Sequence, residues 1–268
     1  MVHAEQVEQA IFDNAKDLGD PGWDEYFGHG RIDAYATLWS VSHDGTVFKV
    51  NALAGEGGTI DPAGENEVVA ASDISFAITP HEGWRIADVL VDGVSVGAVE
   101  GYDFFNVQRD HVIEARFEML VYAVNASVVS GSGTVEPASQ QVAHGEDPEV
   151  VITPAPGWHI AEITDNGNPV EVTNPSGMTY TIQDVTEGHE VLVAFDINTY
   201  AVTALVSSGQ GTVEPATQQV NHGDDATPIT ITPEVGWHIA EITDNGAPVE
   251  VTDPSGMDYT VEDVTENH

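Results

Sequence analysis

The sequence predicts a mainly β protein, made of three small tandem repeats behind a short helical leader. The first observation is repetition: GWHIAEITDNG at Gly157 to Gly167 returns unchanged at Gly236 to Gly246, and a looser copy, GWRIADVLVDG, stands at Gly83 to Gly93. The second is an alternation of apolar and polar residues, broken by glycine and proline turns, from Val47 onward. Together they indicate one small β unit written three times.

The leader, residues 1–42, has a different pattern. Its apolar residues fall at helical spacing up to a Gly- and Pro-containing stop at Asp17 to Gly22, and Arg31 to Leu38 predicts a second short helix. We therefore expect a helix, a loop and a helix. The apolar positions of the first helix are Ala4, Val7, Ala10, Ile11 and Ala15.

The first β repeat is expected over 46–119. Alternating residues predict its strands, and the Asp92-Gly93 dipeptide predicts a hairpin turn. The expected strands are Val47–Ala52, Thr59–Pro62, Ile74–Ile78, Ile86–Val91, Val94–Val96, Tyr102–Phe104 and His111–Phe117.

The second and third repeats are expected over 121–196 and 199–268. With His111, His189 and His268 in register, the first two repeats continue into a last strand, whereas the third stops at its histidine. The third repeat is also longer by one residue between His222 and Thr232.

A repeat without its last strand presents an open edge that another chain could fill by β-augmentation. We expect this edge beside Tyr259, Val261 and Val264. The candidate donors are Thr46 to Ala52 of a neighbouring copy or the N-terminal residues, so the chain is expected to form a homo-oligomer or a filament, or to bind other cell-surface proteins.

The acidic composition limits the kinds of molecule that the chain can bind. Forty-five acidic residues against six basic ones give a net charge of −39, which repels nucleic acid and anionic membrane surfaces. High salt would screen this repulsion, so a saline habitat is expected. No cysteine is present, no apolar run approaches a membrane span, and Met1 to Gln9 lacks the pattern of an export signal.

The leader resembles the last two helices of subtilisin-like serine protease domains over residues 4–38. The residues that match are Ala15, Asp17, Leu18, Gly19, Gly22, Asp24, Phe27, Gly28, Gly30, Asp33 and Ala34, with Phe27 where the family usually has tyrosine. The resemblance implies that His29 and Asp33 occupy structural positions. The family's catalytic Asp, His and Ser segments lie upstream of the matching part and are not in this sequence, so no catalytic residue and no enzymatic activity are expected.

Residues 47–268 are similar to the divergent InlB B-repeat family of bacterial surface and secreted proteins. The pattern is a starting strand, G-x-G-T-V-x-P, a strand ending in Thr-Pro, G-W-x-I, and a final apolar strand ending in Phe. The resemblance implies small β-grasp-like domains in tandem, an extracellular or cell-surface location, and a place behind a catalytic or binding domain.

Three recurring tryptophans, Trp84, Trp158 and Trp237, are expected to be structural anchors, because they hold one position in every copy. Stacking on sugar rings is the alternative. Gly93, Gly167 and Gly246 are expected to close the hairpin turns, with Asp165-Asn166-Gly167 and Asp244-Asn245-Gly246 as turns and not metal loops.

The histidines also recur, but their spacing does not match that of a metal site. We expect locally bonded or solvent-facing imidazoles, no cofactor, and at most weak calcium binding, because no Asp-x-Asp-x-Asp-Gly loop is present. The pairs and triples are His144 with His222, His159 with His238, and His111 with His189 and His268.

The function expected from the sequence is thus a non-catalytic extracellular structural or adhesive array. One alternative is the C-terminal fragment of a secreted subtilisin-like protease with accessory repeats. Another is a carbohydrate- or protein-binding module.

Overall fold

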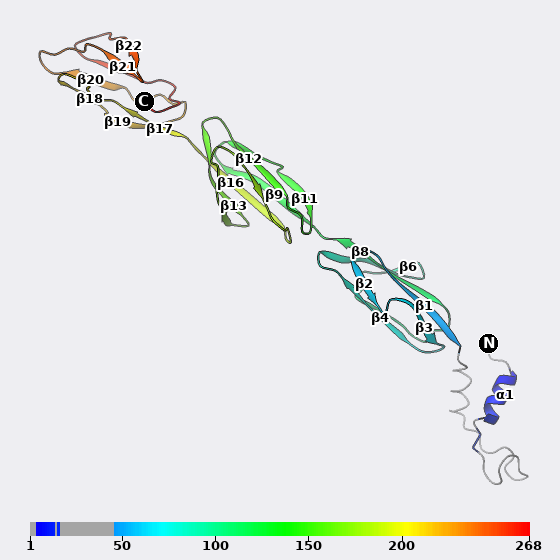
Figure 1. Cartoon of the computed structure of the whole chain (residues 1–268). Coiled ribbons are helices and arrows are strands. Elements are labelled where there is room, and N and C mark those ends of the chain that lie inside the picture. The colour runs from blue at the N-terminus through cyan, green and yellow to red at the C-terminus, as the bar shows by residue number, and fades with distance from the viewer. Residues whose placement is uncertain (1–3, 14, 17–45) are drawn as a thin grey trace, which may run out of the picture. The chain divides into compact units, whose positions relative to one another are not determined.

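A computed structural model of the chain describes residues 4–13, 15–16 and 46–268 (Figure 1). Helix α1 (Ala4–Asp13) is present as the apolar spacing predicts. The loop and second helix expected for the leader lie outside the described residues. The mainly β class is confirmed by the 23 strands in seven small sheets that the described residues form.

The first repeat consists of two sheets around one core. A five-stranded sheet has the order β3-β1-β8-β5-β6, and a three-stranded sheet has the order β2-β4-β7. The last strand, β8, lies in the middle of the larger sheet, parallel to β1 and antiparallel to β5. The bounds are β1 (Val47–Ala54), β2 (Gly58–Asp61), β3 (Gly64–Val69), β4 (Ile74–Pro80), β5 (Trp84–Val91), β6 (Val94–Gly97), β7 (Gly101–Phe104) and β8 (His111–Met119).

The second repeat has the same topology. Its sheets are β11-β9-β16-β13-β14 and β10-β12-β15, and β16 again lies between the first strand and the hairpin. The bounds are β9 (Val121–Ser130), β10 (Gly133–Glu136), β11 (Ser139–Ala143), β12 (Glu149–Pro154), β13 (Trp158–Asp165), β14 (Asn168–Val170), β15 (Met178–Thr181) and β16 (His189–Ile197).

The third repeat keeps the three-stranded sheet, β18-β20-β23, but its larger sheet is divided into the pairs β17-β19 and β21-β22. No strand among its described residues takes the central place of β8 and β16. The bounds are β17 (Thr199–Thr203), β18 (Gly211–Glu214), β19 (Thr217–Asn221), β20 (Ile229–Pro233), β21 (Ile242–Asp244), β22 (Ala247–Val249) and β23 (Met257–Tyr259).

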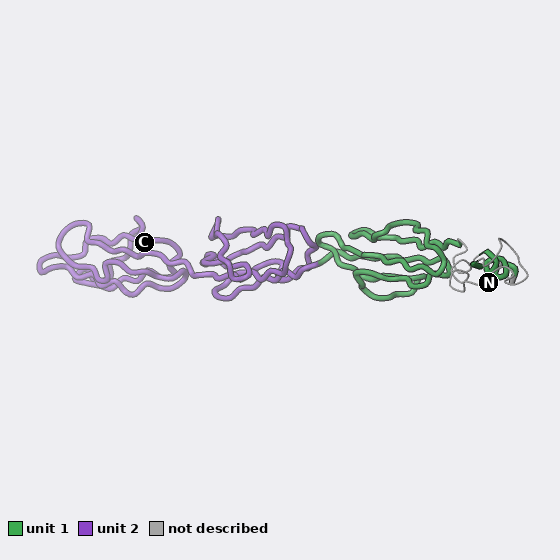
Figure 2. Tube along the Cα trace, turned by 90° about the horizontal axis from the view of Figure 1, so that it is seen from below, with its two compact units in different colours: residues 1–120 green, residues 121–268 purple. Residues whose placement is uncertain are grey.

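Each repeat has its own cluster of buried apolar side chains. In the first and second repeats the last strand contributes to this cluster. Its side chains there are at most 1 % exposed: Ile113 and Ala115 in the first repeat, and Val191, Val193 and Phe195 in the second. Contacts between Cα atoms group the chain into two compact units, residues 1–120 and 121–268 (Figure 2).

Candidate functional site

Each repeat places an aspartate of the hairpin against the histidine at the register position where the last strand begins in the first two repeats. Asp165 and Asp244 end the first hairpin strand, whereas Asp92 follows it in the turn. The His189 Nδ1 atom lies 2.8 Å from Asp165 Oδ2, and His268 Nδ1 lies 2.7 Å from Asp244 Oδ1. In the first repeat His111 Nδ1 lies 2.8 Å from Asp92 Oδ2. The histidines expected to be locally bonded thus hold the hairpin to the last strand.

A tyrosine completes this group in the second and third repeats. The Tyr180 hydroxyl donates to Asp165 Oδ2 at 2.9 Å, and the Tyr259 hydroxyl donates to Asp244 Oδ2 at 2.8 Å. We call these two groups the Tyr–Asp–His triads. Burial, and then the neighbouring aspartate, raise the pKa of each tyrosine to about 12.

The first repeat uses different partners for its aspartate. Arg109 Nη2 donates to Asp92 Oδ2 at 3.0 Å, and the Val112 N–H donates to Asp92 Oδ1 at 3.0 Å. Burial raises the pKa of Asp92, but the hydrogen bonds from the Val112 N–H and from His111, together with the charges of His111 and Arg109, outweigh it and hold that pKa below its usual range.

The hydrogen bonds of each triad join separate segments of one repeat. In a hydrolase triad the histidine bonds to the aspartate through one ring nitrogen and to a nucleophile through the other. His189 and His268 bond to their aspartates through Nδ1. Among the described residues, no hydroxyl or thiol is hydrogen-bonded to their Nε2 atoms. Sequence analysis missed these groups. Tyrosine and histidine recur at one register position in all three repeats, whereas the aspartate recurs only in the second and third, and Val91 holds its position in the first.

The hairpin turns contain the expected Asn-Gly and Asp-Gly dipeptides. Asn166 and Gly167 have φ angles of 47° and 77°, and Asn245 and Gly246 have 44° and 80°. Asp92 and Gly93 follow the same pattern, with φ angles of 50° and 83°. Two successive positive φ angles are those of a type I′ hairpin turn.

The three tryptophans differ in burial. Trp158 is half-buried against the core of the second repeat. Trp84 is half-buried too, with its ring over Gly57, where an added Cβ atom would lie 2.1 Å from the ring atom Cε3. Trp237 is 53 % exposed.

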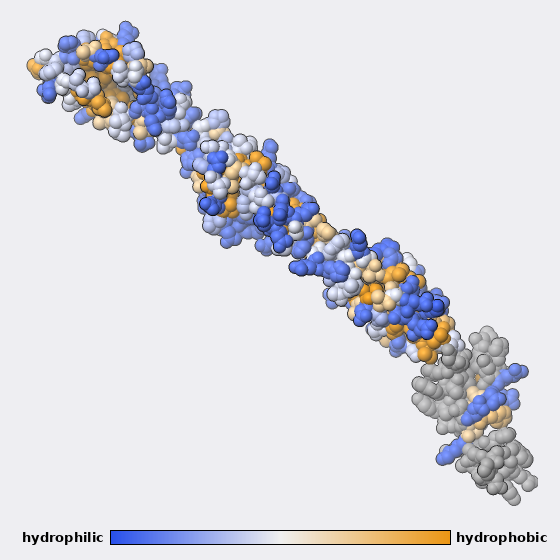
Figure 3. Space-filling view, viewed as in Figure 1, coloured by the Kyte–Doolittle hydropathy of each residue, from blue (hydrophilic) through white to orange (hydrophobic). Residues whose placement is uncertain are grey.

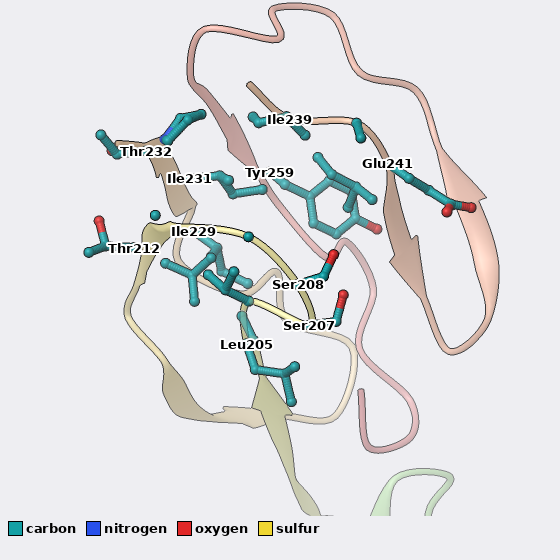
Figure 4. A pocket seen from close by; sticks show the side chains of 18 of the residues that line it. Leu205, Ser207, Ser208, Thr212, Ile229, Ile231, Thr232, Ile239, Glu241 and Tyr259 are labelled. Atoms are coloured by element: carbon teal, nitrogen blue, oxygen red, sulfur yellow. The ribbon is translucent and has the colours of Figure 1, made fainter. Parts of the chain in front are cut away.

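A groove of about 650 Å³ opens in the third repeat where Trp237 is exposed. Its walls are the end of β17 with the residues that follow it, from Val202 to Gly211, and the segment from Gly236 to Asp244. Ile229, Ile231 and Tyr259 face this space from β20 and β23, with Ile239 across from them (Figure 4). Figure 3 shows apolar surface gathered on this repeat. We call this space the strand groove.

The strand groove occupies the place of β8 and β16. In the first two repeats the strand in that place pairs on one side with β1 or β9 and on the other with β5 or β13. In the third repeat the flanking strands are shorter: β17 ends at Thr203 and β21 begins only at Ile242.

Of the three residues expected at the open edge, Tyr259 and Val261 line the strand groove and Val264 does not. Val261 and Val264 are 5 % and 0 % exposed and belong to the core of the third repeat. Tyr259 lies in β23, which pairs with β20. The last strand is central in the sheet and not next to its sequence neighbour, so the space it leaves lies between β17 and β21.

The remaining recurring histidines have separate surroundings. Among the described residues no three His, Asp or Glu side chains come together in a way that could hold a metal ion. His159 bonds to Asn198, His144 lies 3.3 Å from the Tyr122 hydroxyl, and His222 has a buried Nδ1 atom without a hydrogen-bond partner. His29 and Asp33 lie outside the described residues.

A family model decides the affiliation of the chain. The divergent InlB B-repeat domain matches residues 123–198 and 200–266, which together are more than half of the sequence. The chain belongs to the divergent InlB B-repeat family. The two matches are the second and third repeats, and the first repeat has the topology of the second. Residues 4–38 lie outside the match, so their resemblance to a protease stays a prediction.

Other comparisons add little. No curated protein matches the chain. A three-domain tandem of titin, I9–I11, is similar over 82 % of this chain and 89 % of that one, at 8 % identity and a TM-score of 0.14. A Bacteroides ovatus protein of a mixed-linkage glucan utilization locus, SGBP-B, in complex with a heptasaccharide, covers 82 % and 88 % at 10 % identity and a TM-score of 0.13. These scores are too low to carry an argument. No helix in the described part of the B-repeat chain is long and apolar enough to cross a membrane.

Proposed function

We propose that this B-repeat chain is a non-catalytic extracellular array that serves as a structural or adhesive spacer. The observation that carries the proposal is that each of the three repeats has its own buried core. Modules with separate cores can be added in tandem without rearranging their neighbours. The acidic composition supports a location where salt screens the charge, at the cell surface or outside the cell.

Solution scattering on the full chain tests the spacer. A single globule of this length has a radius of gyration of about 18 Å. We expect a clearly larger value, which stays the same over a dilution series, because a spacer keeps its modules separate. A radius near 18 Å would contradict the proposal.

The adhesive part of the proposal is the acceptance of a β strand by the third repeat. The sequence suggested a second copy of the chain as the donor, which would lead to filaments. Sedimentation velocity over a range of concentrations tests this version: mass that grows with concentration supports assembly between copies, and a constant monomer mass contradicts it.

A second candidate function is carbohydrate binding, favoured by the exposed Trp237 at the rim of the strand groove. Aromatic faces of this kind can stack on sugar rings. Glycan-array binding that is lost in Trp237→Ala, but kept in Trp158→Ala, would support it. An array without hits would exclude it for the glycans present.

The protease alternative rests on the resemblance of residues 4–38 alone. The chain is expected to show no peptidase activity on unfolded casein. Activity that copurifies with the full chain, and is lost in Asp33→Ala, would contradict a purely structural leader.

A further inference from the structure

We infer that a joint of four residues holds the second and third repeats in one fixed orientation, so that these two repeats move as one rigid body. The joint residues are Gly157 and His159 of the second repeat, Asn198 between the repeats, and His222 of the third. Contacts between Cα atoms place both repeats in one compact unit, residues 121–268. Such a joint is independent of the spacer function proposed above, because a spacer can also have freely hinged modules.

Asn198 is the centre of the joint, because it is hydrogen-bonded to both repeats. It is the single residue between β16 and β17. Its N–H donates to the Gly157 carbonyl at 2.8 Å, and its own carbonyl accepts the His222 N–H at 2.8 Å. Its side-chain Oδ1 atom lies 2.9 Å from His159 Nδ1. Three groups of this linker residue are thus occupied, and a rotation of its backbone would break at least one of the hydrogen bonds.

The His222 ring packs directly on the second repeat. A Cβ atom added to Gly157 would lie 2.1 Å from Cδ2 and 2.5 Å from Cγ of this ring, so the ring fills the space where any other residue has its side chain. Gly157 also has a φ angle of 78°, which favours glycine. The contact therefore requires glycine at position 157 even if the backbone could accept another residue.

His222 lacks the hydrogen bond that its counterpart in the second repeat makes. The Nδ1 atom of that counterpart, His144, lies 3.3 Å from the Tyr122 hydroxyl, and the two ring centroids are 6.0 Å apart. The rings of His222 and Tyr200 are also 6.0 Å apart, yet the buried His222 Nδ1 atom has no hydrogen-bond partner among the described residues. The place of this ring is therefore set by its packing on Gly157 and not by a hydrogen bond of Nδ1.

The counterpart of Gly157 in the third repeat shows that the turn does not itself require such a contact. Gly236 begins the second copy of GWHIAEITDNG and has a φ angle of 91°. A Cβ atom added to Gly236 would meet no atom within 4 Å in the described part of the chain. The same turn thus forms without a ring on its glycine, and the contact with His222 belongs to the joint.

The distance between two spin labels tests the joint in the full chain. The sequence has no cysteine, so Thr153→Cys and Thr232→Cys give one label in each repeat, at exposed and equivalent positions of β12 and β20. We expect pulsed electron paramagnetic resonance to show one narrow distribution of distances. A distribution as broad as that of two domains on a free linker would overturn the inference.

A matched pair of glycine substitutions tests the contact with His222. Gly157→Ala places a methyl group where the ring lies, and should broaden the distance distribution at least about twofold, because the ring is displaced. Gly236→Ala puts alanine at a similar positive φ angle without a neighbour to meet, and should leave the width unchanged. Equal widths for the two variants would contradict the role of the ring. Circular dichroism shows whether both variants fold.

A second set of variants leaves both glycines in place. Leucine stands at the position of Asn198 in the first repeat, as Leu120, and its side chain cannot bond to His159. Asn198→Leu and His222→Ala should each broaden the distribution, and the double variant should broaden it at least about twofold. A narrow distribution in the double variant would overturn the inference, because other contacts would then hold the repeats. Label distances report on the joint and scattering reports on the array, so the joint and the spacer can fail separately.

Discussion

At the scale of single residues, the Tyr–Asp–His triads connect three elements that are distant in sequence. Asp165 is 8 % exposed and accepts hydrogen bonds from Tyr180 on β15 and His189 on β16. A buried carboxylate is costly unless it is paired, and here both of its oxygens are used. The triad therefore fixes the end of the hairpin relative to both sheets of the repeat.

Replacing Asp165 with alanine should destabilise the second repeat by about 1–3 kcal/mol, because it leaves the Tyr180 hydroxyl and the His189 ring without their partner. Hydrogen exchange of the β13 and β16 amides measures this. Glu187→Ala, at an exposed acidic position in the same repeat, should change protection by less than about 0.5 kcal/mol. Equal effects of the two substitutions would show that the triad contributes nothing.

The tyrosines predict an alkaline transition. Their folded pKa of about 12 lies above the ordinary value of 10.0, so the folded state holds the proton more tightly than the unfolded chain does. This contribution to stability is complete below about pH 10 and is lost as the pH rises toward 12. Absorbance at 295 nm should show two late-titrating tyrosines, one of which disappears in Tyr180→Phe and the other in Tyr259→Phe.

At the scale of elements, the last strand decides how well the repeat's tryptophan is buried. With β8 or β16 in place, Trp84 and Trp158 are half-buried, while Trp237, beside the strand groove, is 53 % exposed. The sequence around Trp158 and Trp237 is identical over eleven residues, so the difference comes from the neighbouring strand and not from local sequence.

This contrast predicts unequal costs for the same substitution. Trp158→Ala removes an aromatic ring packed against the core and should cost about 3 kcal/mol, whereas Trp237→Ala should cost less than about 1 kcal/mol. Hydrogen exchange followed by mass spectrometry compares the second and third repeats within one chain. A cost at Trp237 as large as that at Trp158 would mean that exposure does not govern the role of this position.

At the scale of the whole molecule, the charge of −39 opposes folding through self-repulsion. We expect the melting temperature to rise between low salt and about 1 M sodium chloride, where the screening length is about 3 Å, and to rise equally with potassium chloride. A few millimolar calcium should raise it no more than magnesium does at equal ionic strength. A larger rise of the melting temperature with calcium than with magnesium would indicate a specific calcium site, which the sequence does not predict.

The alternation of apolar residues was sufficient to predict most strands, but not the third strand of each repeat. In β3, Glu65, Asn66 and Glu67 are polar, and Val68 is the residue that reaches the core. An edge strand pairs on one side only, so its sequence needs little β preference and gives little signal. The triads were missed for another reason: their members lie on different strands, and register alone shows that they recur.

The sequence by itself determined the repeat, its hairpin turns and the mainly β class, because these depend on residue spacing and on the positive φ angles of Asn-Gly and Asp-Gly turns. Only the tertiary structure decided where the strand groove lies. The last strand of the first two repeats is inserted between the first strand and the hairpin, far from its sequence neighbours, and pairing order in a sheet is set by packing and not by local pattern. The open space therefore lies between β17 and β21, beside Trp237, with Tyr259 and Val261 among the residues that line it.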